Sequence, residues 1–466
     1  MIGLPVEVFM WVCLLFGILH YASIFGFGVL SRRSLRQNRA SSRAGARDVA
    51  LRAKLPGVSI MMPAYNEAVV IVEAVRSALS MNYEDIEVIV INDGSSDATI
   101  QVLVDAFGLT AAPSPPAPGP IPCQPVRDLY RSRTDDRLVV VDKERAGSKG
   151  DGVNCGVNLS TKEWVVVMDG DELVDPDALL RCMTQMKYTP GEVGAIGVTL
   201  LPTNECDVSR GRVLTPRVAR NPIVGFQIVE YLSAFVMSRP GMAAIGAMPI
   251  ISGGFGVFRR SEIVGIGGFP HPHLGEDLEI VVRLRRKWKE NGKDYKAIQV
   301  TDAIVWTEFP STIASLQRQR MRWHRGLRQV LSAHSDAIGR PRYGTFGTVG
   351  LMVMFLFEWV APFMEVFGLA SLLLLALVDA SRVSRGIGLL VASQVLGVLI
   401  TTSSVWTATH HLGVYRSWKD TARLLGYAVF SQFGFRQLTL FWRMRSLSKK
   451  KQEWGAMARV GYKSQP

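Results

Sequence analysis

The feature that most constrains this chain is a run of 23 residues, positions 8–30, that contains no Asp, Glu, Lys or Arg. As an α-helix it is about 34 Å long at roughly 1.5 Å per residue, enough to cross the core of a bilayer. It lacks the basic start and the small-residue cleavage site of a signal peptide, so we expect a retained membrane anchor. Two further apolar stretches, about 349–378 and 387–409, predict more spans.

A fourth apolar stretch, about 424–442, is interrupted by Gln432, Arg436 and Gln437. These polar residues favour an amphipathic helix along the membrane interface over a further crossing, although both interpretations remain open.

Two acidic residues, Glu358 and Glu365, lie seven positions apart in the second apolar stretch, hence roughly on one helix face. Carboxylates inside a membrane usually face the interior of a helix bundle. We expect Glu358 and Glu365 either to line a polymer path or to form a structural ion pair with Arg436 or His410.

The charge of the chain is unevenly placed. Lys and Arg number 53 against 40 Asp and Glu, a net charge of +13, and the cations gather at 32–54 and 443–451, beside apolar stretches. Such clusters bind anionic lipid headgroups and mark the cytoplasmic side. We therefore expect a multi-pass protein of the inner (plasma) membrane, with residues 31–345 in the cytoplasm and no nucleic-acid partner. A crossing at 424–442 would place the basic tail outside, against the same rule. The five cysteines show no paired metal spacing.

From position 57 short β-rich runs alternate with helical patterns, which predicts an α/β domain with a mostly parallel sheet. The strands are expected at 58–62, 86–91, 138–141 and 164–168, with a helix at 68–79. Ligands of such sheets bind beyond the carboxyl ends of the strands. The region 220–340 reads as mostly helical and ends in a basic amphipathic helix at 311–332, typical of a membrane-surface helix. The predicted organisation is an anchor (1–31), a basic linker (32–56), the α/β domain (57–310) with a proline-rich surface insertion (112–125), an interface-helix region (311–345), membrane helices (346–442) and a basic tail (443–466).

Two carboxylates, Asp169 and Asp171, directly follow the apolar strand at 164–168. Mg²⁺ or Mn²⁺ is commonly held by one or two carboxylates together with phosphate oxygens, and such an ion neutralises a departing diphosphate. The pair alone is more typical of a solvated acidic turn, which is common at strand ends. The fully apolar strand before it and the matching motifs elsewhere in the chain favour a metal site.

Three more polar groups follow strand ends or open a helix. Asp93 can accept a hydrogen bond from a base or a ribose, and Tyr65 offers a face for stacking a nucleobase. Lys149 lies in a glycine-rich loop that can approach phosphate, but the Walker spacing is absent, which disfavours ATP hydrolysis.

Asp277 is expected at the start of a helix, where a carboxylate either stabilises the helix terminus or deprotonates a hydroxyl. On the basic helix, Arg322 offers a guanidinium fork suited to diphosphate, and Trp323 offers an indole face suited to a sugar ring. Membrane-surface anchoring is the alternative for that pair.

Together these motifs resemble the membrane-integrated, processive branch of the family 2 inverting glycosyltransferases, which includes cellulose, hyaluronan, chitin and poly-N-acetylglucosamine synthases. The resemblance implies a GT-A-like nucleotide-sugar domain with interface helices and a transmembrane bundle. It implies that Asp277 is the catalytic base, within a motif shared with Glu276. The other residues it implies are donor-binding Pro63, Tyr65, Glu67, Asp93, Lys149, Asp151, Asn154, Asp169 and Arg322, metal-binding Asp169 and Asp171, and acceptor-binding Phe255, Gly256, Gln319 and Trp323.

The resemblance further implies transfer from a UDP-sugar to a growing β-linked glycan, with Mg²⁺ or Mn²⁺ as cofactor, the lipid bilayer as surroundings and accessory export subunits as candidate partners. Two alternatives stay open. One is non-processive transfer to a lipid carrier, and the other is a catalytically silent membrane component of an export assembly.

Overall fold

The computed structural model describes residues 3–47, 54–112, 117, 119–271, 274–378, 383–415 and 417–447. The chain forms two compact units. The membrane unit comprises Met1–Arg33, Arg220–Ala247 and Pro310–Lys450, and the sheet unit comprises Ser34–Ala219 and Met248–Phe309. Residues 48–53 of the predicted linker, five residues of the proline-rich insertion and the basic tail from 448 onward lie outside the described residues.

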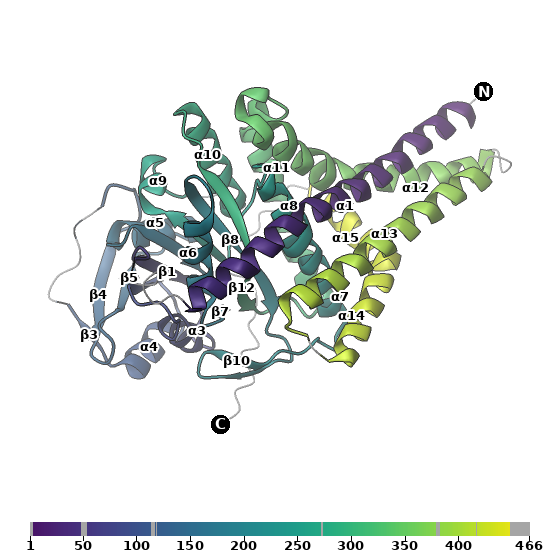
Figure 1. Cartoon of the computed structure of the whole chain (residues 1–466). Helices are drawn as coiled ribbons and strands as arrows, with labels where there is room; N and C mark the ends of the chain where they lie inside the picture. Colours follow the sequence, from purple (N-terminus) through teal and green to yellow (C-terminus); the bar gives the residue numbers. More distant parts are fainter. Residues whose placement is uncertain are drawn as a thin grey trace. The chain divides into compact units, whose positions relative to one another are not determined.

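The sheet unit is built on a mixed ten-stranded sheet in the order β3-β4-β5-β2-β1-β6-β11-β8-β12-β7 (Figure 1). Strands β5, β2, β1 and β6 run parallel, whereas β3, β4, β11 and β7 are antiparallel to their neighbours. This confirms the predicted α/β class. The strands are β1 (Val58–Ala64), β2 (Ile86–Asn92), β3 (Leu109–Ala111), β4 (Val126–Ser132), β5 (Leu138–Lys143), β6 (Trp164–Met168), β7 (Leu173–Val174), β8 (Val193–Pro202), β11 (Phe255–Arg259) and β12 (Lys296–Thr307), with a separate hairpin of β9 (Asp207–Ser209) and β10 (Arg212–Thr215).

The central strands lie in the core. Every residue of β1, β6 and β8 is buried, because helices cover both faces of the sheet, and this is why their sequences are nearly continuous apolar runs. Helix α5 packs on β1 and β2, and α6 packs on β12 and β8. The helices of this unit are α3 (Ile71–Leu79), α4 (Thr99–Phe107), α5 (Lys149–Leu159), α6 (Ala178–Tyr188), α9 (Arg260–Gly265) and α10 (Glu276–Glu290).

The expectation that 220–340 is mostly helical is wrong for two segments. Strand β11 pairs with β6 and β8, and strand β12 pairs with β8 and β7. Their partners lie many tens of residues away in the sequence, so tertiary pairing rather than a local pattern makes these segments strands.

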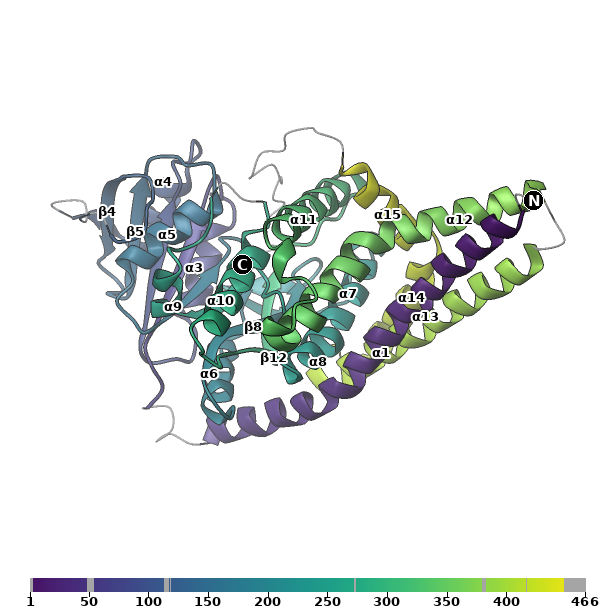
Figure 2. The same cartoon turned by 90° about the horizontal axis from the view of Figure 1, so that it is seen from above.

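Three described helical runs of the membrane unit are long and apolar enough to cross a bilayer, namely Leu4–Ser42, Phe346–Leu377 and Gly386–Leu412. They coincide with the three apolar stretches predicted as spans. Helices α1, α12 and α13 lie side by side in both views (Figures 1 and 2). The helices are α1 (Gly3–Arg47), α7 (Pro222–Ser233), α8 (Arg239–Ala244), α11 (Ile313–Ala333), α12 (Ala361–Val378), α13 (Val383–Leu412), α14 (Trp418–Phe430) and α15 (Arg436–Arg445), with π-helical turns at Ala234–Ser238, Phe346–Leu351, Met354–Val360 and Ser431–Phe435 and 3₁₀ turns at Ser335–Ala337 and Pro341–Tyr343.

The fourth apolar stretch is not one continuous helix. Helix α14 ends at Phe430 and α15 begins at Arg436, with non-helical backbone at Phe433 and Gly434 between them. Gly434 has φ +85°, a conformation that favours glycine. The break fits the interfacial interpretation of 424–442 better than a straight crossing.

The two acidic residues of the second span have partners in the same unit. Glu365 forms an ion pair with Arg436, as one of the two sequence-based alternatives predicted. Glu358 pairs with Arg443 at 3.2 Å. Pairing lowers the cost of placing these carboxylates in an apolar setting.

The segment predicted as a basic linker is helical as far as Arg47, and from Ser34 onward it belongs to the sheet unit. Asn38 is buried, and its amide donates to the Gln299 carbonyl and to Thr301 Oγ1, each at 3.1 Å. Ser42 donates to Asp302 Oδ2 at 2.5 Å. These contacts join the helix to β12.

Candidate active site

The polar motifs meet at one edge of the sheet because the four parallel strands end there. Tyr65 follows β1, Asp93 follows β2 and Asp169 follows β6, while α5 begins six residues after β5 ends. Phe255, the first residue of antiparallel β11, pairs with Met168, so the segment before β11 reaches the same edge.

Lys149 is the central cation of this edge. Its ammonium forms an ion pair with Asp169 Oδ1 and donates to the Gly253 carbonyl at 2.5 Å. Burial lowers the pKa of Lys149, but the nearby carboxylates of Asp169, Glu276 and Glu172 outweigh that effect, so its pKa is raised. Lys149 therefore stays charged and can hold an anion.

A small pocket lies beside this ion pair. Lys149 supplies its cation, and Glu276 and Asp277, in the first turn of α10, supply its carboxylates. Its walls are apolar side chains from β6, β11, α5, α10 and the segments before β11 and before α10, namely Val153, Val167, Ile251, Phe258, Phe269 and Ile280, with Ser252 and Gly253 completing the lining. Gly253 is close to the base candidate, because a Cβ built on it would lie 3.2 Å from Asp277 Cβ.

The Asp-Gly-Asp turn is held between β1 and β12. A Cβ on Gly170 would lie 3.6 Å from Glu67 Cγ and 3.7 Å from the Pro63 carbonyl, so both residues approach the turn. Asp171 is buried and accepts a hydrogen bond from Thr307 Oγ1 at 3.2 Å. Asp169 is the more accessible carboxylate, with a side chain 36% exposed.

The two residues expected to contact the nucleobase have protein partners. The guanidinium of Arg145 lies 4.3 Å from the Tyr65 ring centroid. Asp93 is buried and accepts the backbone N–H groups of Ala146 and Gly147, each at 3.0 Å.

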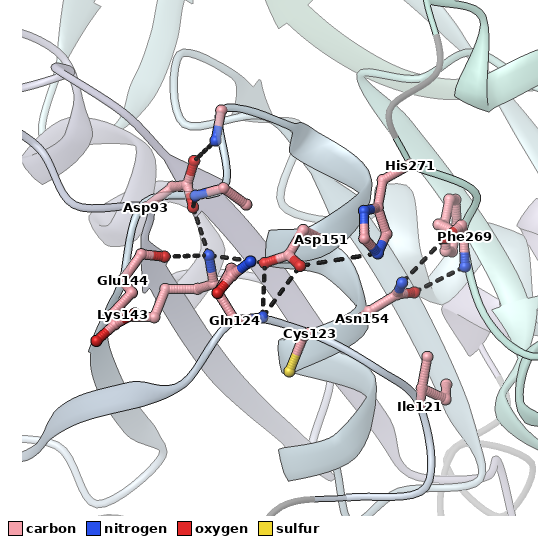
Figure 3. Close-up of polar contacts among 12 residues, drawn as sticks. Asp93, Ile121, Cys123, Gln124, Lys143, Glu144, Asp151, Asn154, Phe269 and His271 are labelled. Carbon is pink, nitrogen blue, oxygen red and sulfur yellow. Dashed lines mark hydrogen bonds and ion pairs between the residues drawn. The ribbon is translucent and has the colours of Figure 1, made fainter.

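The sequence interpretation missed Lys143, which lies fully buried at the end of β5 between Asp93 and Asp151 (Figure 3). A lysine next to a loop is usually solvated, so residue type gave no signal. Its position in the strand gave a weak signal. Lys143 lies two residues after the buried Val141 and therefore on the same face of β5.

Two expected acceptor-binding residues, Phe255 and Gly256, are buried within β11, whereas Ser252 and Gly253, just before it, line the pocket. The remaining three predicted residues lie on α11 of the membrane unit. There Arg320 pairs with Glu230 and lies 4.8 Å from the Trp323 ring centroid, Trp323 is 38% exposed, and Gln319 and Arg322 are half-buried.

A family model described as "Glycosyl transferase family group 2" matches residues 164–409, more than half of the chain. The chain belongs to this family. A second model, "Glycosyl transferase family 2", matches residues 59–112, which include β1 and β2. The protein is therefore a glycosyltransferase.

Similar curated proteins are poly-β-1,6-N-acetyl-D-glucosamine synthases. That of Staphylococcus aureus (strain COL) is 25% identical over 280 residues, which cover 60% of this chain and 56% of the relative. That of Staphylococcus epidermidis is 26% identical over the same shares. This glycosyltransferase thus spans about half the length of the curated relatives it matches.

Among solved structures, a mannosyltransferase from Pyrobaculum calidifontis in complex with GDP-Man and Mn²⁺ is similar to this glycosyltransferase, with a TM-score of 0.54 and 19% identity. The match covers 91% of this chain and 99% of that chain. It supports the predicted GT-A-like fold.

Proposed function

We propose that this glycosyltransferase uses a UDP-sugar to elongate a β-linked polysaccharide at the cytoplasmic face of the plasma membrane, with inversion at the anomeric carbon. The observation that carries the proposal is that Lys149 and Asp277 line one pocket at the carboxyl edge of the parallel strands, where Asp169 forms an ion pair with Lys149. Because the curated relatives are named as poly-β-1,6-N-acetyl-D-glucosamine synthases, UDP-N-acetylglucosamine is the first donor to test.

On the donor side, we assign binding of the diphosphate to Lys149, whose raised pKa keeps it cationic. We assign binding of the nucleobase to the edge near Tyr65 and Asp93. The ion pair with Asp169 holds the ammonium at the pocket until phosphate oxygens replace or share that contact.

The same edge fits Mg²⁺ or Mn²⁺ in its donor chemistry. Among the described residues no group of three or more His, Cys, Asp or Glu is arranged around a metal, but a site of one or two carboxylates plus phosphate oxygens needs no such group. Asp169, the exposed member of the pair, would hold the ion, and buried Asp171 would support the turn. When bound, the cation supplies positive charge to the diphosphate.

On the acceptor side, Asp277 is placed to act as the general base. Its Oδ1 accepts the N–H of Leu278 at 2.9 Å, which fixes the carboxylate and leaves Oδ2 directed toward Gly253. In the proposed step Oδ2 takes the proton of the acceptor hydroxyl while that oxygen bonds to the anomeric carbon. The bond from this carbon to the diphosphate breaks, and UDP leaves. In-line attack on an α-linked donor gives a β-linkage.

The membrane unit supports the polymerising part of the proposal. Gln319, Arg322 and Trp323 match the pattern that marks the processive branch, and we assign Arg322 to the diphosphate and the other two to the acceptor. The three candidate spans of the membrane unit support export of the glycan across the membrane.

The test is UDP release by the purified protein in liposomes, measured over a panel of UDP-sugars with and without Mn²⁺. We expect one preferred donor, dependence on the metal, and a long product. The Asp277→Asn variant should lose at least about 10²-fold in turnover while still binding UDP, because only proton removal is impaired.

A matched control is Asp294→Asn, which neutralises an exposed carboxylate on the same unit and should keep turnover within two-fold. Strong residual turnover of Asp277→Asn would remove this residue from the base role. A single-addition product would favour transfer to a lipid carrier, and the absence of UDP release with every donor would favour a silent export component.

A further inference from the structure

A fully buried ammonium lies behind the donor side of the pocket. Lys143 donates to the Glu144 carbonyl at 2.7 Å, contacts Asp151 Oδ1 at 2.7 Å and forms an ion pair with Asp93 Oδ1 (Figure 3). These three contacts use the donors of the ammonium. A buried ion pair is weak evidence for stability, since desolvation offsets much of the attraction, but it fixes the groups it joins in one geometry.

One partner of Lys143 holds the loop that leads into α5. Asp93 accepts the backbone N–H groups of Ala146 and Gly147 at 3.0 Å, only two residues before Lys149. The position of the cation that faces the pocket therefore depends on the Asp93–Lys143 contact.

The other partner, Asp151, lies two residues after Lys149 on α5, and this spacing places the two residues on opposite sides of the helix. It accepts the backbone N–H of Gln124 at 3.1 Å, and the ring of His271 lies 3.8 Å from its Oδ2. The side chain of Asp151 is 1% exposed and contacts three protein groups, namely Lys143, Gln124 and His271.

Asn154, one turn further along α5, is also buried and pairs with a single residue. Its amide donates to the Phe269 carbonyl at 2.9 Å, and its carbonyl accepts the Phe269 N–H at 2.7 Å. Phe269 lines the pocket and lies in the segment that precedes α10, the helix that carries Asp277. Asn154 thus connects helix α5, which carries Lys149, to the segment that precedes Asp277.

We propose that Lys143, Asp151 and Asn154, here called the brace, are positioning residues that set the distance between the donor cation and the base, rather than groups that contact the nucleotide. The proposal rests on the proposed function for the roles of Lys149 and Asp277. It differs from the family resemblance, which assigns Asp151 and Asn154 to the donor. We therefore expect the brace to affect the rate of transfer and not the binding of UDP, because it fixes the positions of Lys149 and Asp277 relative to each other.

The sharpest variant is Asn154→Ala, which removes two hydrogen bonds to Phe269. A small displacement of a catalytic group can cost on the order of 10²-fold in rate. We expect kcat to fall by about 10- to 100-fold, while the Kd of UDP, measured by titration calorimetry with Mn²⁺, changes less than two-fold. A nucleotide-contacting Asn154 would instead raise the Kd of UDP.

Helix α5 offers a matched control. Asn158 makes the same pair of amide–backbone bonds, donating to the Ile121 carbonyl at 2.7 Å and accepting the Ile121 N–H at 3.1 Å, but not with the segment before α10. Asn158→Ala should therefore keep kcat within two-fold. An equal loss of kcat in both variants would show that the effect is general loosening of α5 and would overturn the proposal.

The charge of the brace gives a second test. Lys143→Met leaves the carboxylates of Asp93 and Asp151 close together and without their cation, so we expect a loss of kcat of about 10-fold or more. Adding Asp151→Asn removes one of these charges and should restore part of that loss. If Asp151 contacts the nucleotide instead, the double variant should be less active than either single variant.

Folding of each variant is checked by its elution profile and apparent melting temperature in detergent, and UDP binding is measured on the same preparations. If the wild-type protein binds UDP but releases none from any donor, the proposed function fails. If the wild type is active and Asn154→Ala raises the Kd of UDP in proportion to its loss of activity, the brace fails and the proposed function stands.

Discussion

At the scale of single residues, two neighbouring thiols differ in acidity. Cys123 is half-buried in the segment that lies along α5, and Cys155 is buried on that helix. A hydrogen bond from Cys155 lowers the pKa of Cys123 to about 7, helped by the Asn158 amide at 3.7 Å, whereas the pKa of Cys155 is raised. Because the thiolate is the nucleophile, Cys123 should be the reactive cysteine of the pair.

This predicts that iodoacetamide modifies Cys123 first, at a rate that falls as the pH drops below about 7, where the thiol becomes protonated. Peptide mass mapping over pH 5.5–9 measures the profile. Replacing Cys155 with Ala removes the donor and should move the midpoint to higher pH, while Cys206, whose pKa burial raises to about 11, serves as the unreactive control. If the pH dependence of Cys123 modification is unchanged in the Cys155→Ala variant, the hydrogen-bond explanation is wrong.

How much of the site could be predicted also varies by residue. Local sequence is enough to predict the positions of three site residues. Asp169 directly follows a parallel strand, and Lys149 and Asp277 lie at the starts of helices. The partner of Lys143 is a carboxylate fifty residues earlier in the chain, so only the fold shows that this lysine is buried and paired. Motif matching found Asn154, but its contact with Phe269 depends on tertiary packing.

At the scale of elements, α1 shows where local patterns suffice and where they do not. Its apolar part follows from composition, since crossing a bilayer requires only length and low polarity. Its basic continuation is predicted as a juxtamembrane linker because a cluster of arginines directly follows the apolar span. Asn38 and Ser42 are nevertheless spaced one helical turn apart and contact β12, and this uncharged pair among arginines is the signal that could have revealed the helix.

The segment before α10 gives a prediction about one element. Gly268 has φ +80°, and a Cβ there would lie 2.4 Å from Asn154 Oδ1 and 2.5 Å from Ile121 Cγ2. Gly268→Ala should therefore lower stability by about 2 kcal/mol or more, through backbone strain and overlap combined, and should reduce turnover.

The neighbouring glycine separates the two causes. Gly267 has φ +77° but no atom within 4 Å of an added Cβ, so Gly267→Ala tests strain alone and should cost roughly 1–2 kcal/mol. Denaturant titration of both variants in detergent provides the comparison. Equal costs would mean that the close approach of Asn154 does not constrain this segment.

At the scale of the whole molecule, a topology of three crossings would remove the conflict that the charge pattern raised. If positions 8–30 cross inward, Phe346–Leu377 crosses outward and Gly386–Leu412 crosses back, then both basic clusters lie in the cytoplasm. The break at Gly434 is what makes a fourth crossing unfavourable, because it interrupts the helix within the apolar stretch. Composition alone could not decide whether 424–442 crosses the membrane, because the positive φ of Gly434 cannot be predicted from the apolar character of the segment.

Cysteine accessibility can test this topology in intact membranes. In a Cys123→Ser background, we expect an impermeant maleimide added from outside to label Ser384→Cys, an exposed position at the start of α13, because the chain turns outside between the second and third spans. Leu447→Cys, exposed just after α15, should be protected until the membrane is permeabilised, because three crossings return this end of the chain to the cytoplasm. Labelling of Leu447→Cys from outside would require 424–442 to cross, despite its break, and would place the basic tail on the side that the positive-inside rule disfavours.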